Sequence, residues 1–250
     1  MIEEEEYIQA LIELHVGLER QGPGDIDFSN HILSMLSGLL VNPRIADIGC
    51  GAGAGALLLA DRFKSSVRSV DLSQEFLNEL IDRARQRGLG HLVETIKCDM
   101  GSLNWTPGTV DLLWSEGAAY NLTFEGALRA WRPLMATNGI AVISELSYFT
   151  SDVPESLRAY WQDAYPTIGT ESENSNQANS SGFEVLGVHR LPSEAWWDNY
   201  YEPLKTNMLS FKHSEDKIMR SVIREAEEEM SLFNEYEKYY GYSFYVMKAV

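Results

Sequence analysis

The sequence predicts an α/β fold built on a doubly wound, mostly parallel sheet. Between residues 43 and 147, short apolar runs alternate with longer amphipathic stretches of helical spacing. The first apolar run leads into a glycine-rich turn, in "IADIGCGAGAG" at residues 45–55. Strands that alternate with helices in this way are joined by right-handed crossovers, which make neighbouring strands parallel.

The elements of this core follow one another in a regular order. Five strands are expected, over "RIADIG", "SVRSVDLS", "HLVETIKCDM", "TVDLLWSEG" and "NGIAVISEL". Three helices are expected among them, over "GALLLADRF", "SQEFLNELIDRARQRG" and "FEGALRAWRPLM". Ser73 suits the N-cap of the second helix, and Gly88 lies just past its end.

The segments that flank the core are expected to be mainly helical. "QGPGDID" separates an amphipathic helix, "EEEEYIQALIELHVGLER", from a second helix, "FSNHILSMLSGLL". After residue 147 we expect a helix over "PESLRAYWQDAY", a polar loop or weak helix at 170–182, a strand over "FEVLGVHRL", an aromatic stretch over "SEAWWDNYYEPL", a long charged helix at 213–240 and a last strand over "YSFYVMKAV". We therefore expect one domain over 1–250, with an N-terminal helical lid at 1–42, a core at 43–147, and a substrate-side elaboration with closing strands at 148–250.

Composition and charge narrow the class of ligand. The net charge of −17 repels polyanions, and no basic patch offsets it, so a small-molecule substrate is favoured over nucleic acid. The two cysteines form no metal or disulfide spacing, which fits a reducing compartment. An acidic N-terminus and the lack of a ~20-residue apolar run favour a cytoplasmic protein without a membrane segment. We expect a monomer or homodimer.

The glycine turn is expected to hold a ligand against the backbone. Such turns use glycines for a tight bend, for close approach of the ligand and for helix packing. In this sequence the three roles are assigned to Gly49, Gly51 and Gly53. The spacing does not complete the dinucleotide fingerprint, since position 54 is alanine. The carboxylate of Asp47, two residues before the turn, repels a pyrophosphate and suits a ligand that carries an ammonium or another positive charge.

Two further acids end the next two strands. Asp71 is at the position where acids accept hydrogen bonds from ribose hydroxyls, and Asp99 with Met100 borders the expected place of an adenine ring. Each acid taken alone is also a common turn or N-cap residue. Together with Asp47 they indicate a nucleoside with a cationic, amino-bearing tail and no phosphates. S-adenosylmethionine meets that description.

These motifs resemble those of class I S-adenosylmethionine-dependent methyltransferases. "ADIGCGAG", "SVDLS", "KCDM" and "VDLLWSEG" resemble the first four strand motifs, and "LRAWRPLMATNGIAVISE" is similar to the helix and fifth strand, over about residues 25–150. "ERQGPG", "WSEGAAYNLTFEGAL" and "YYGYSFYVMKA" resemble a bacterial group of small-molecule methyltransferases without assigned substrates. The resemblance implies a Rossmann-like, seven-stranded sheet whose closing strands are antiparallel.

The resemblance also implies roles for individual residues. The first-motif acid and glycines hold the methionine moiety, the second-strand acid binds ribose, and the third-strand acid faces the adenine amino group. Leu72 and Met100 would pack on the adenosine, whereas Cys50 occupies a variable loop position. The expected cofactor site comprises Asp47, Gly49, Cys50, Gly51, Gly53, Asp71, Leu72, Asp99, Met100 and Glu116.

Methyl transfer is an in-line displacement, so the protein mainly aligns the reactants and excludes water. No metal is required, and a base is needed only for an acceptor that starts protonated. Glu116, at the end of the fourth strand, is a candidate base, substrate anchor or structural hydrogen-bond acceptor. His15 is either a packed core residue or a base, and Tyr120 and Asn121 either orient substrate or cap the following helix.

Aromatic residues of the flanking segments are the second group of candidates. Trp161 and Tyr165 are four residues apart and are expected on one helical face. With Trp197 and Tyr201, and their neighbours Trp196 and Tyr200, they either line a substrate pocket or belong to the core.

Alternatives to a small-molecule methyltransferase remain at this point. One is a nucleotide (NAD)-dependent oxidoreductase, which Asp47 and the incomplete fingerprint disfavour. A second is a non-catalytic, methyltransferase-like binding module. A third is a methyltransferase for RNA or protein, disfavoured by charge alone.

Overall fold

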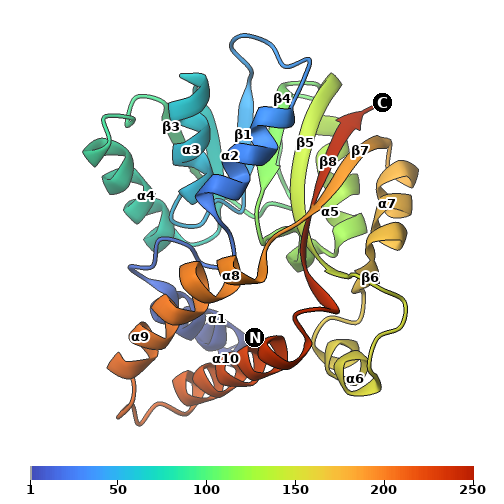
Figure 1. Cartoon of the computed structure of the whole chain (residues 1–250). Helices are drawn as coiled ribbons and strands as arrows, with labels where there is room; N and C mark the ends of the chain where they lie inside the picture. Colours follow the sequence, from blue (N-terminus) through green and yellow to red (C-terminus); the bar gives the residue numbers. More distant parts are fainter. Residues whose placement is uncertain (1) are drawn as a thin grey trace.

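Seven strands form one sheet in the order β3-β2-β1-β4-β5-β8-β7, in a computed structural model that describes residues 2–250 (Figure 1). The parallel strands β1 to β5 span Ile45–Ile48, Val67–Asp71, Val93–Lys97, Val110–Ser115 and Met135–Tyr148. The last strand, β8 (Tyr240–Ala249), runs antiparallel to both β5 and β7 (Phe183–Arg190). The predicted Rossmann-like sheet with an antiparallel last strand is confirmed. A two-residue strand, β6 (Gly169–Thr170), pairs with β5 outside this order.

The two central strands are buried along their whole length because helices cover both faces of the sheet. Every residue of β1 and β4 is buried, which explains their nearly continuous apolar runs. Helices α2 (Ile26–Met35), α3 (Ala54–Phe63) and α4 (Gln74–Gln86) pack into the core cluster on one side. Helices α5 (Phe124–Trp131) and α7 (Glu171–Ser180) contribute to a second cluster on the other side. The sheet thus separates two apolar layers.

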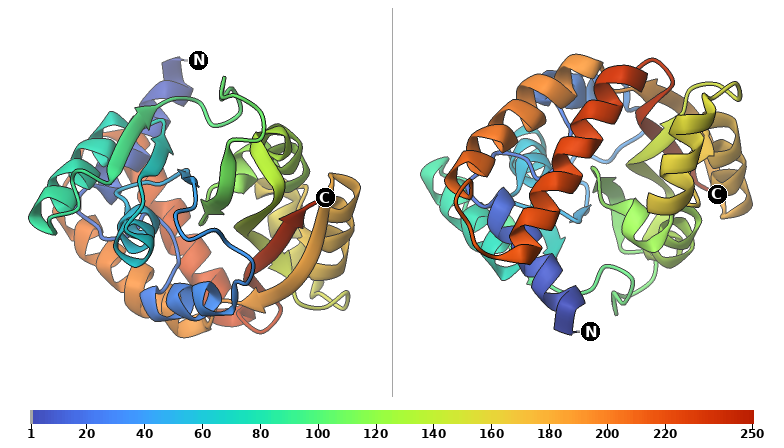
Figure 2. Two further views of the ribbon diagram at one scale, coloured as in Figure 1. Left: turned by 90° about the horizontal axis from the view of Figure 1, so that it is seen from above. Right: turned by 90° about the horizontal axis from the view of Figure 1, so that it is seen from below.

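A layer of helices lies across the carboxyl ends of the parallel strands (Figures 1 and 2). It contains α1 (Ile2–His15), α9 (Glu202–Ser210) and α10 (Lys217–Tyr236), and α1 contacts both of the others. A short helix, α8 (Ser193–Trp196), and a π-helical turn, η3 (Trp197–Tyr201), lead into α9. Helix α6 (Glu155–Ala164) lies at the same end of the sheet. None of the helices within residues 2–250 is long and apolar enough to cross a membrane.

Several elements differ from the sequence expectation at their ends. The segment expected as a polar loop or weak helix at 170–182 contains the helix α7 (Glu171–Ser180), because Thr170 and Glu173 form a reciprocal capping box at its start. Helix α2 ends at Met35 although helical spacing extends to residue 40, and Leu40 and Val41 are exposed. The expected common face of Trp161 and Tyr165 is wrong, since α6 ends at Ala164 and Tyr165 has left the helical conformation.

Candidate cofactor and active site

The glycine turn connects β1 to α3 and is held by both neighbouring strands. Gly49, Gly51 and Gly53 have φ values of 74°, 51° and 92°, which other residues adopt at a cost. The backbone N–H groups of Gly49 and Cys50 donate to the Val70 carbonyl at 2.8 and 2.9 Å. A Cβ on Gly49 would overlap Ala118, which follows β4, so this glycine also lets the two loops meet.

A segment before α2 covers the glycine turn. The Gln21 side-chain oxygen accepts from the Ala52 N–H at 2.7 Å and lies where a Cβ on Gly51 would be. Arg83 of α4 donates to the carbonyls of Leu18 at 2.7 Å and Ala52 at 3.3 Å. The covering segment and the turn are therefore joined through side chains from two different elements.

Asp47 is a buried carboxyl group beside the turn, and one of its oxygens has no hydrogen-bond partner among the described residues. Its side chain belongs to β1, the residue is 3% exposed, and its Oδ2 atom has no hydrogen-bond partner among the residues that the structure describes. Burial, followed by the charge of Glu116, holds the pKa of Asp47 well above its usual range. A buried carboxylate is costly without a cationic or hydrogen-bonding partner. The free acceptor atom of Asp47 fits a ligand that carries an ammonium group.

Asp71 and Asp99 close turns at the ends of β2 and β3. Asp71 accepts from the Gly51 N–H at 2.8 Å and from the Ser73 N–H at 2.9 Å, and burial raises its pKa despite these bonds. Asp99 is exposed and accepts from the Gly101 N–H at 2.8 Å. Each carboxylate oxygen has two lone pairs, so these turn contacts leave acceptor sites for a ligand. Their roles toward ribose and adenine stay predictions.

The neighbours of these acids differ in accessibility. Leu72 is 61% exposed beside Asp71, which leaves an apolar side chain available for packing. Met100 is partly buried, and its carbonyl accepts from the Trp131 indole N–H at 2.9 Å. Cys50 is buried, and burial raises the pKa of its thiol well above the usual range, so the thiol is not a nucleophile at neutral pH.

Glu116 connects the end of β4 to the N-terminal segment. Its Oε2 accepts from Arg20 at 2.6 Å, in an ion pair whose side chains are 9% and 11% exposed. Its Oε1 accepts from the Trp114 indole at 2.7 Å and from the Ser29 hydroxyl at 3.0 Å. This arrangement matches the structural-acceptor hypothesis, because the Arg20 ion pair compensates the charge of the carboxylate and three hydrogen bonds fix its position.

His15 has the environment of a packed core residue. Its Nδ1 lies 2.7 Å from the Leu11 carbonyl, which only accepts, so Nδ1 carries the proton. Nε2 then accepts from the Tyr200 hydroxyl at 3.0 Å, and the two rings stack. Burial lowers the pKa of His15, which keeps the ring neutral.

Tyr120 and Asn121 lie on a 3₁₀ turn, η1 (Ala119–Leu122), after β4. The capping hypothesis for this pair is wrong, because Thr123 is the N-cap of α5 and accepts from the Gly126 N–H at 3.2 Å. Asn121 instead donates to the Ala118 carbonyl at 3.0 Å. Tyr120 is 44% exposed and meets Tyr165 edge-on, with ring centroids 6.1 Å apart.

The tryptophans pack within the helical layer. Trp161 meets Tyr240 edge-on at 5.4 Å, and Trp196 stacks on Phe233 at 4.3 Å. Trp197 meets Tyr201 edge-on at 5.1 Å. Of the predicted aromatic candidates, Tyr120 and Tyr165 contact one another, whereas Trp161, Trp197 and Tyr201 contribute mainly to the core.

Sequence reasoning missed two acids among these aromatic residues. Glu145 of β5 is 2% exposed, and burial raises its pKa to about 8. Glu229 of α10 accepts from the Tyr201 hydroxyl at 2.8 Å, and burial raises its pKa also. After burial, the charges of both acids further raise the pKa of the Tyr120 and Tyr242 hydroxyls. We call Glu145, Glu229, Tyr120, Tyr165, Tyr200, Tyr201 and Tyr242 the acidic–aromatic cluster.

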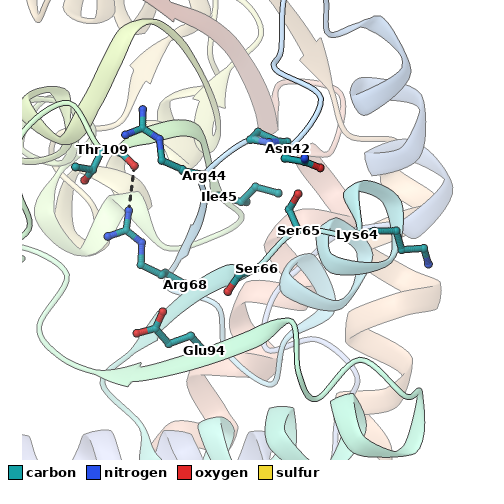
Figure 3. Close-up of a pocket in the computed structure, with 10 residues that line it drawn as sticks. Asn42, Arg44, Ile45, Lys64, Ser65, Ser66, Arg68, Glu94 and Thr109 are labelled. Atoms are coloured by element: carbon teal, nitrogen blue, oxygen red, sulfur yellow. Dashed lines mark hydrogen bonds between the residues drawn. The ribbon is translucent and has the colours of Figure 1, made fainter.

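A separate cleft lies at the opposite end of the sheet (Figure 3). Arg44, Lys64 and Glu94 line it, and the Arg68 guanidinium donates to the Thr109 carbonyl at 3.3 Å. Ligands of open α/β sheets bind beyond the carboxyl ends of the strands. The glycine turn and the acidic–aromatic cluster lie at that end, and this cleft does not.

Comparison with known proteins agrees with a cofactor site at the carboxyl ends of the parallel strands. Residues 45–139 match the family described as "Methyltransferase domain". The chain is 23% identical over 192 residues to a sarcosine/dimethylglycine N-methyltransferase of Halorhodospira halochloris, covering 72% of this chain and 68% of that protein. Residues 45–139 thus carry the methyltransferase domain that the sequence motifs predict.

Solved structures of other proteins share the whole architecture. YjhP of E. coli superposes with a TM-score of 0.81 at 18% identity, covering 97% of this chain and 100% of that chain. A methyltransferase of Geobacter sulfurreducens, solved with S-adenosyl-L-homocysteine, gives 0.79 at 16% identity and covers 97% and 98%. Three other curated relatives are longer, and the chain spans only 30%, 37% and 38% of them.

Proposed function

We propose that this methyltransferase transfers the methyl group of S-adenosylmethionine to a small-molecule acceptor at the carboxyl ends of β4 and β5. The observation that carries the proposal is the buried, unpartnered Oδ2 of Asp47 beside the glycine turn. Among common nucleotide cofactors, a diphosphate would bring a second negative charge to this atom, whereas the ammonium of S-adenosylmethionine supplies the missing positive charge.

Each part of the cofactor has residues suited to it. Asp47 and the turn of Gly49, Gly51 and Gly53 would hold the methionine moiety, and Asp71 would accept from the ribose. Asp99 would face the adenine amino group, with Leu72 and Met100 against the ring. The bound cofactor supplies a methyl group on a positively charged sulfur, which is a good electrophile without a metal.

The N-terminal region suits the role of a lid over this site. Gln21 covers Gly51, and Arg20 pairs with Glu116 at the end of β4. Residues 1–42 would exclude water when the donor and acceptor are bound. In this division of the single domain, residues 43–147 hold the cofactor and residues 148–250 provide the acceptor side.

A small acceptor is supported by charge and by relatives. The net charge of −17 opposes nucleic acid, and the carboxyl edge is covered by helices. Two curated relatives are named for methylation of small amines, one for sarcosine and dimethylglycine and one, from wheat, for phosphoethanolamine.

Calorimetry and labelled transfer test the proposal together. The protein is titrated with S-adenosylmethionine, S-adenosylhomocysteine and NAD, and is then incubated with a metabolite extract, total RNA or a protein extract and a methyl-labelled donor. The proposal is supported if S-adenosylmethionine and S-adenosylhomocysteine bind and if the labelled methyl group appears in small molecules. Tight binding of NAD without any response to S-adenosylhomocysteine would overturn it. Donor binding without label in any extract would instead favour a binding module.

A further inference from the structure

We propose that the acceptor is an amine that enters as its ammonium ion, and that Glu145 binds this ammonium and takes its proton. The inference rests on the proposed function, because it names the substrate class of the same site. Glu145 is 2% exposed, and neither Oε atom has a partner at normal hydrogen-bond distance among the described side chains. Longer polar contacts with the Tyr165 hydroxyl and the Leu146 backbone N–H lower the pKa of Glu145 but do not offset the effect of burial. Burial makes the ionised form of such a group costly and keeps it protonated, and a cationic ligand stabilises the ionised form.

Strand register places Glu145 beside the expected methyl position. Ser115 at the end of β4 pairs with Ile143 of β5. Two residues further on, the Gly117 N–H donates to the Ser144 hydroxyl at 2.7 Å. Ser144 therefore contacts the loop that carries Glu116 and Ala118, and Ala118 in turn contacts the glycine turn. Glu145 is the next residue of β5 and projects from the other face of the sheet at the same level. A donor anchored at Asp47 and an acceptor anchored at Glu145 would meet across this loop.

The residues around Glu145 suit an ammonium ion. The hydroxyl of Tyr165, which follows α6, approaches Glu145 closely enough to lower the pKa of that carboxyl by hydrogen bonding, and within residues 4–250 it has no partner at normal hydrogen-bond distance. Tyr120 offers an accessible ring, and the Tyr242 hydroxyl reaches to 3.3 Å from a Cβ position on Gly117. Aromatic rings with a carboxylate bind ammonium groups through cation–π and charge interactions.

The charge balance of the cluster favours a cation over other acceptors. Within residues 4–250, neither Glu145 nor Glu229 forms an ion pair with a lysine or arginine. Glu229 accepts from the Tyr201 hydroxyl. An alcohol or phenol brings no positive charge to this cluster, and a carboxylate or phosphate is repelled by it. An ammonium supplies the partner that the protein itself lacks.

Glu145 also has the right acidity to accept the substrate proton. Burial raises its pKa to about 8, between that of an ordinary carboxyl and that of an alkyl ammonium. The ammonium gives one proton to the carboxylate, and the nitrogen lone pair that is freed forms the bond to the methyl carbon. The carbon–sulfur electron pair returns to sulfur, which becomes a neutral thioether. The methylated product carries the positive charge on nitrogen, and the proton on Glu145 leaves to solvent.

Proton release on binding follows from the same groups. At pH 7 and without ligand, a carboxyl with a pKa of about 8 is mostly protonated. The groups whose charges interact with Glu145 are phenols, Tyr165, Tyr120, Tyr242 and Tyr245, and their pKa values are all raised. The charge of Glu229 also acts on Tyr120 and Tyr242. None of these phenols ionises near pH 7. Binding an ammonium should ionise Glu145 and release about one proton.

The experiment measures binding of amines to the protein saturated with S-adenosylhomocysteine. A panel of small amines, from methylamine to 2-phenylethylamine, is titrated against the alcohols of the same skeletons, in two buffers of different ionisation enthalpy. We expect at least one amine to bind ten-fold or more tightly than its alcohol and to release about one proton at pH 7. Glu145→Gln should remove that preference and that proton while S-adenosylhomocysteine affinity stays within two-fold.

The control variant Glu215→Gln removes an exposed carboxylate outside the cluster and should leave the amine preference unchanged. If alcohols bind as well as amines, or if amine binding releases no proton, the amine assignment is wrong although methyl transfer stands. Failure of the protein to bind S-adenosylhomocysteine instead counts against the proposed function, so the two failures are distinguishable.

Discussion

Replacing Glu145 by glutamine should stabilise the protein by an amount that increases with pH. The folded-state pKa of about 8 lies above the usual carboxyl value of 4.5, so the folded protein retains a proton that the unfolded chain releases. Between pH 4.5 and pH 8, the wild-type free energy of unfolding therefore falls by about 1.4 kcal/mol for each pH unit that the pH rises. The shift of about 3.5 pH units limits the whole loss to roughly 5 kcal/mol. Glutamine has no proton to lose, and any effect of its amide on packing is a constant offset.

Urea unfolding at pH 5, 6, 7 and 8 measures this difference directly. We expect the stability of Glu145→Gln relative to wild type to increase by about 3–4 kcal/mol from pH 5 to pH 8. Glu215→Gln shows the effect of removing a surface carboxylate, and the titrations of all other groups cancel between wild type and variant. Parallel stability profiles for wild type and Glu145→Gln would refute the reasoning, because they would mean that Glu145 ionises inside the protein as it does in water.

Three further substitutions test other parts of the site. Arg20→Met leaves the Glu116 carboxylate buried without its cation, so we expect the free energy of unfolding to fall by about 3 kcal/mol. Hydrogen exchange over residues 18–24 should also become faster. Unchanged exchange there would show that the ion pair does not hold the covering segment. Asp71→Ala removes the acceptor of the Gly51 N–H and should weaken S-adenosylhomocysteine binding by about 1–3 kcal/mol; unchanged affinity in a folded variant would remove Asp71 from the site. His15→Phe should leave kcat and its pH profile within two-fold of wild type, since the ring is neutral and packed on Tyr200; a hundred-fold loss of kcat with intact binding would restore His15 as a base.

The cofactor side of the site was largely predictable from sequence, because its residues follow strand ends. Asp47 lies in the second half of β1, Asp71 ends β2 and Asp99 follows β3, and parallel strands bring these positions to one edge of the sheet. The mostly parallel sheet and its antiparallel last strand were predictable from the resemblance. The capping box of α7 was also present in the sequence, as Thr170 and Glu173, but the polar composition of the segment left a loop and a weak helix both open.

The acceptor side was not predictable in the same way, because it depends on contacts between distant segments. Glu145 stands inside the apolar run "AVISEL", and only the cover provided by other elements shows that its carboxylate is buried. Arg20 finds its partner 96 residues away. An acid within an otherwise apolar strand is the one local signal that pointed to Glu145.

Titration of S-adenosylhomocysteine into wild type and Asp47→Asn tests the central claim most directly. Asparagine keeps the shape of the side chain and removes its charge, and circular dichroism reports whether the fold is intact. The account predicts that wild type binds the ligand and that the variant binds it at least ten-fold more weakly, because the ligand ammonium loses its carboxylate. Equal affinity of the two proteins, or a wild type that binds NAD and not S-adenosylhomocysteine, would contradict it.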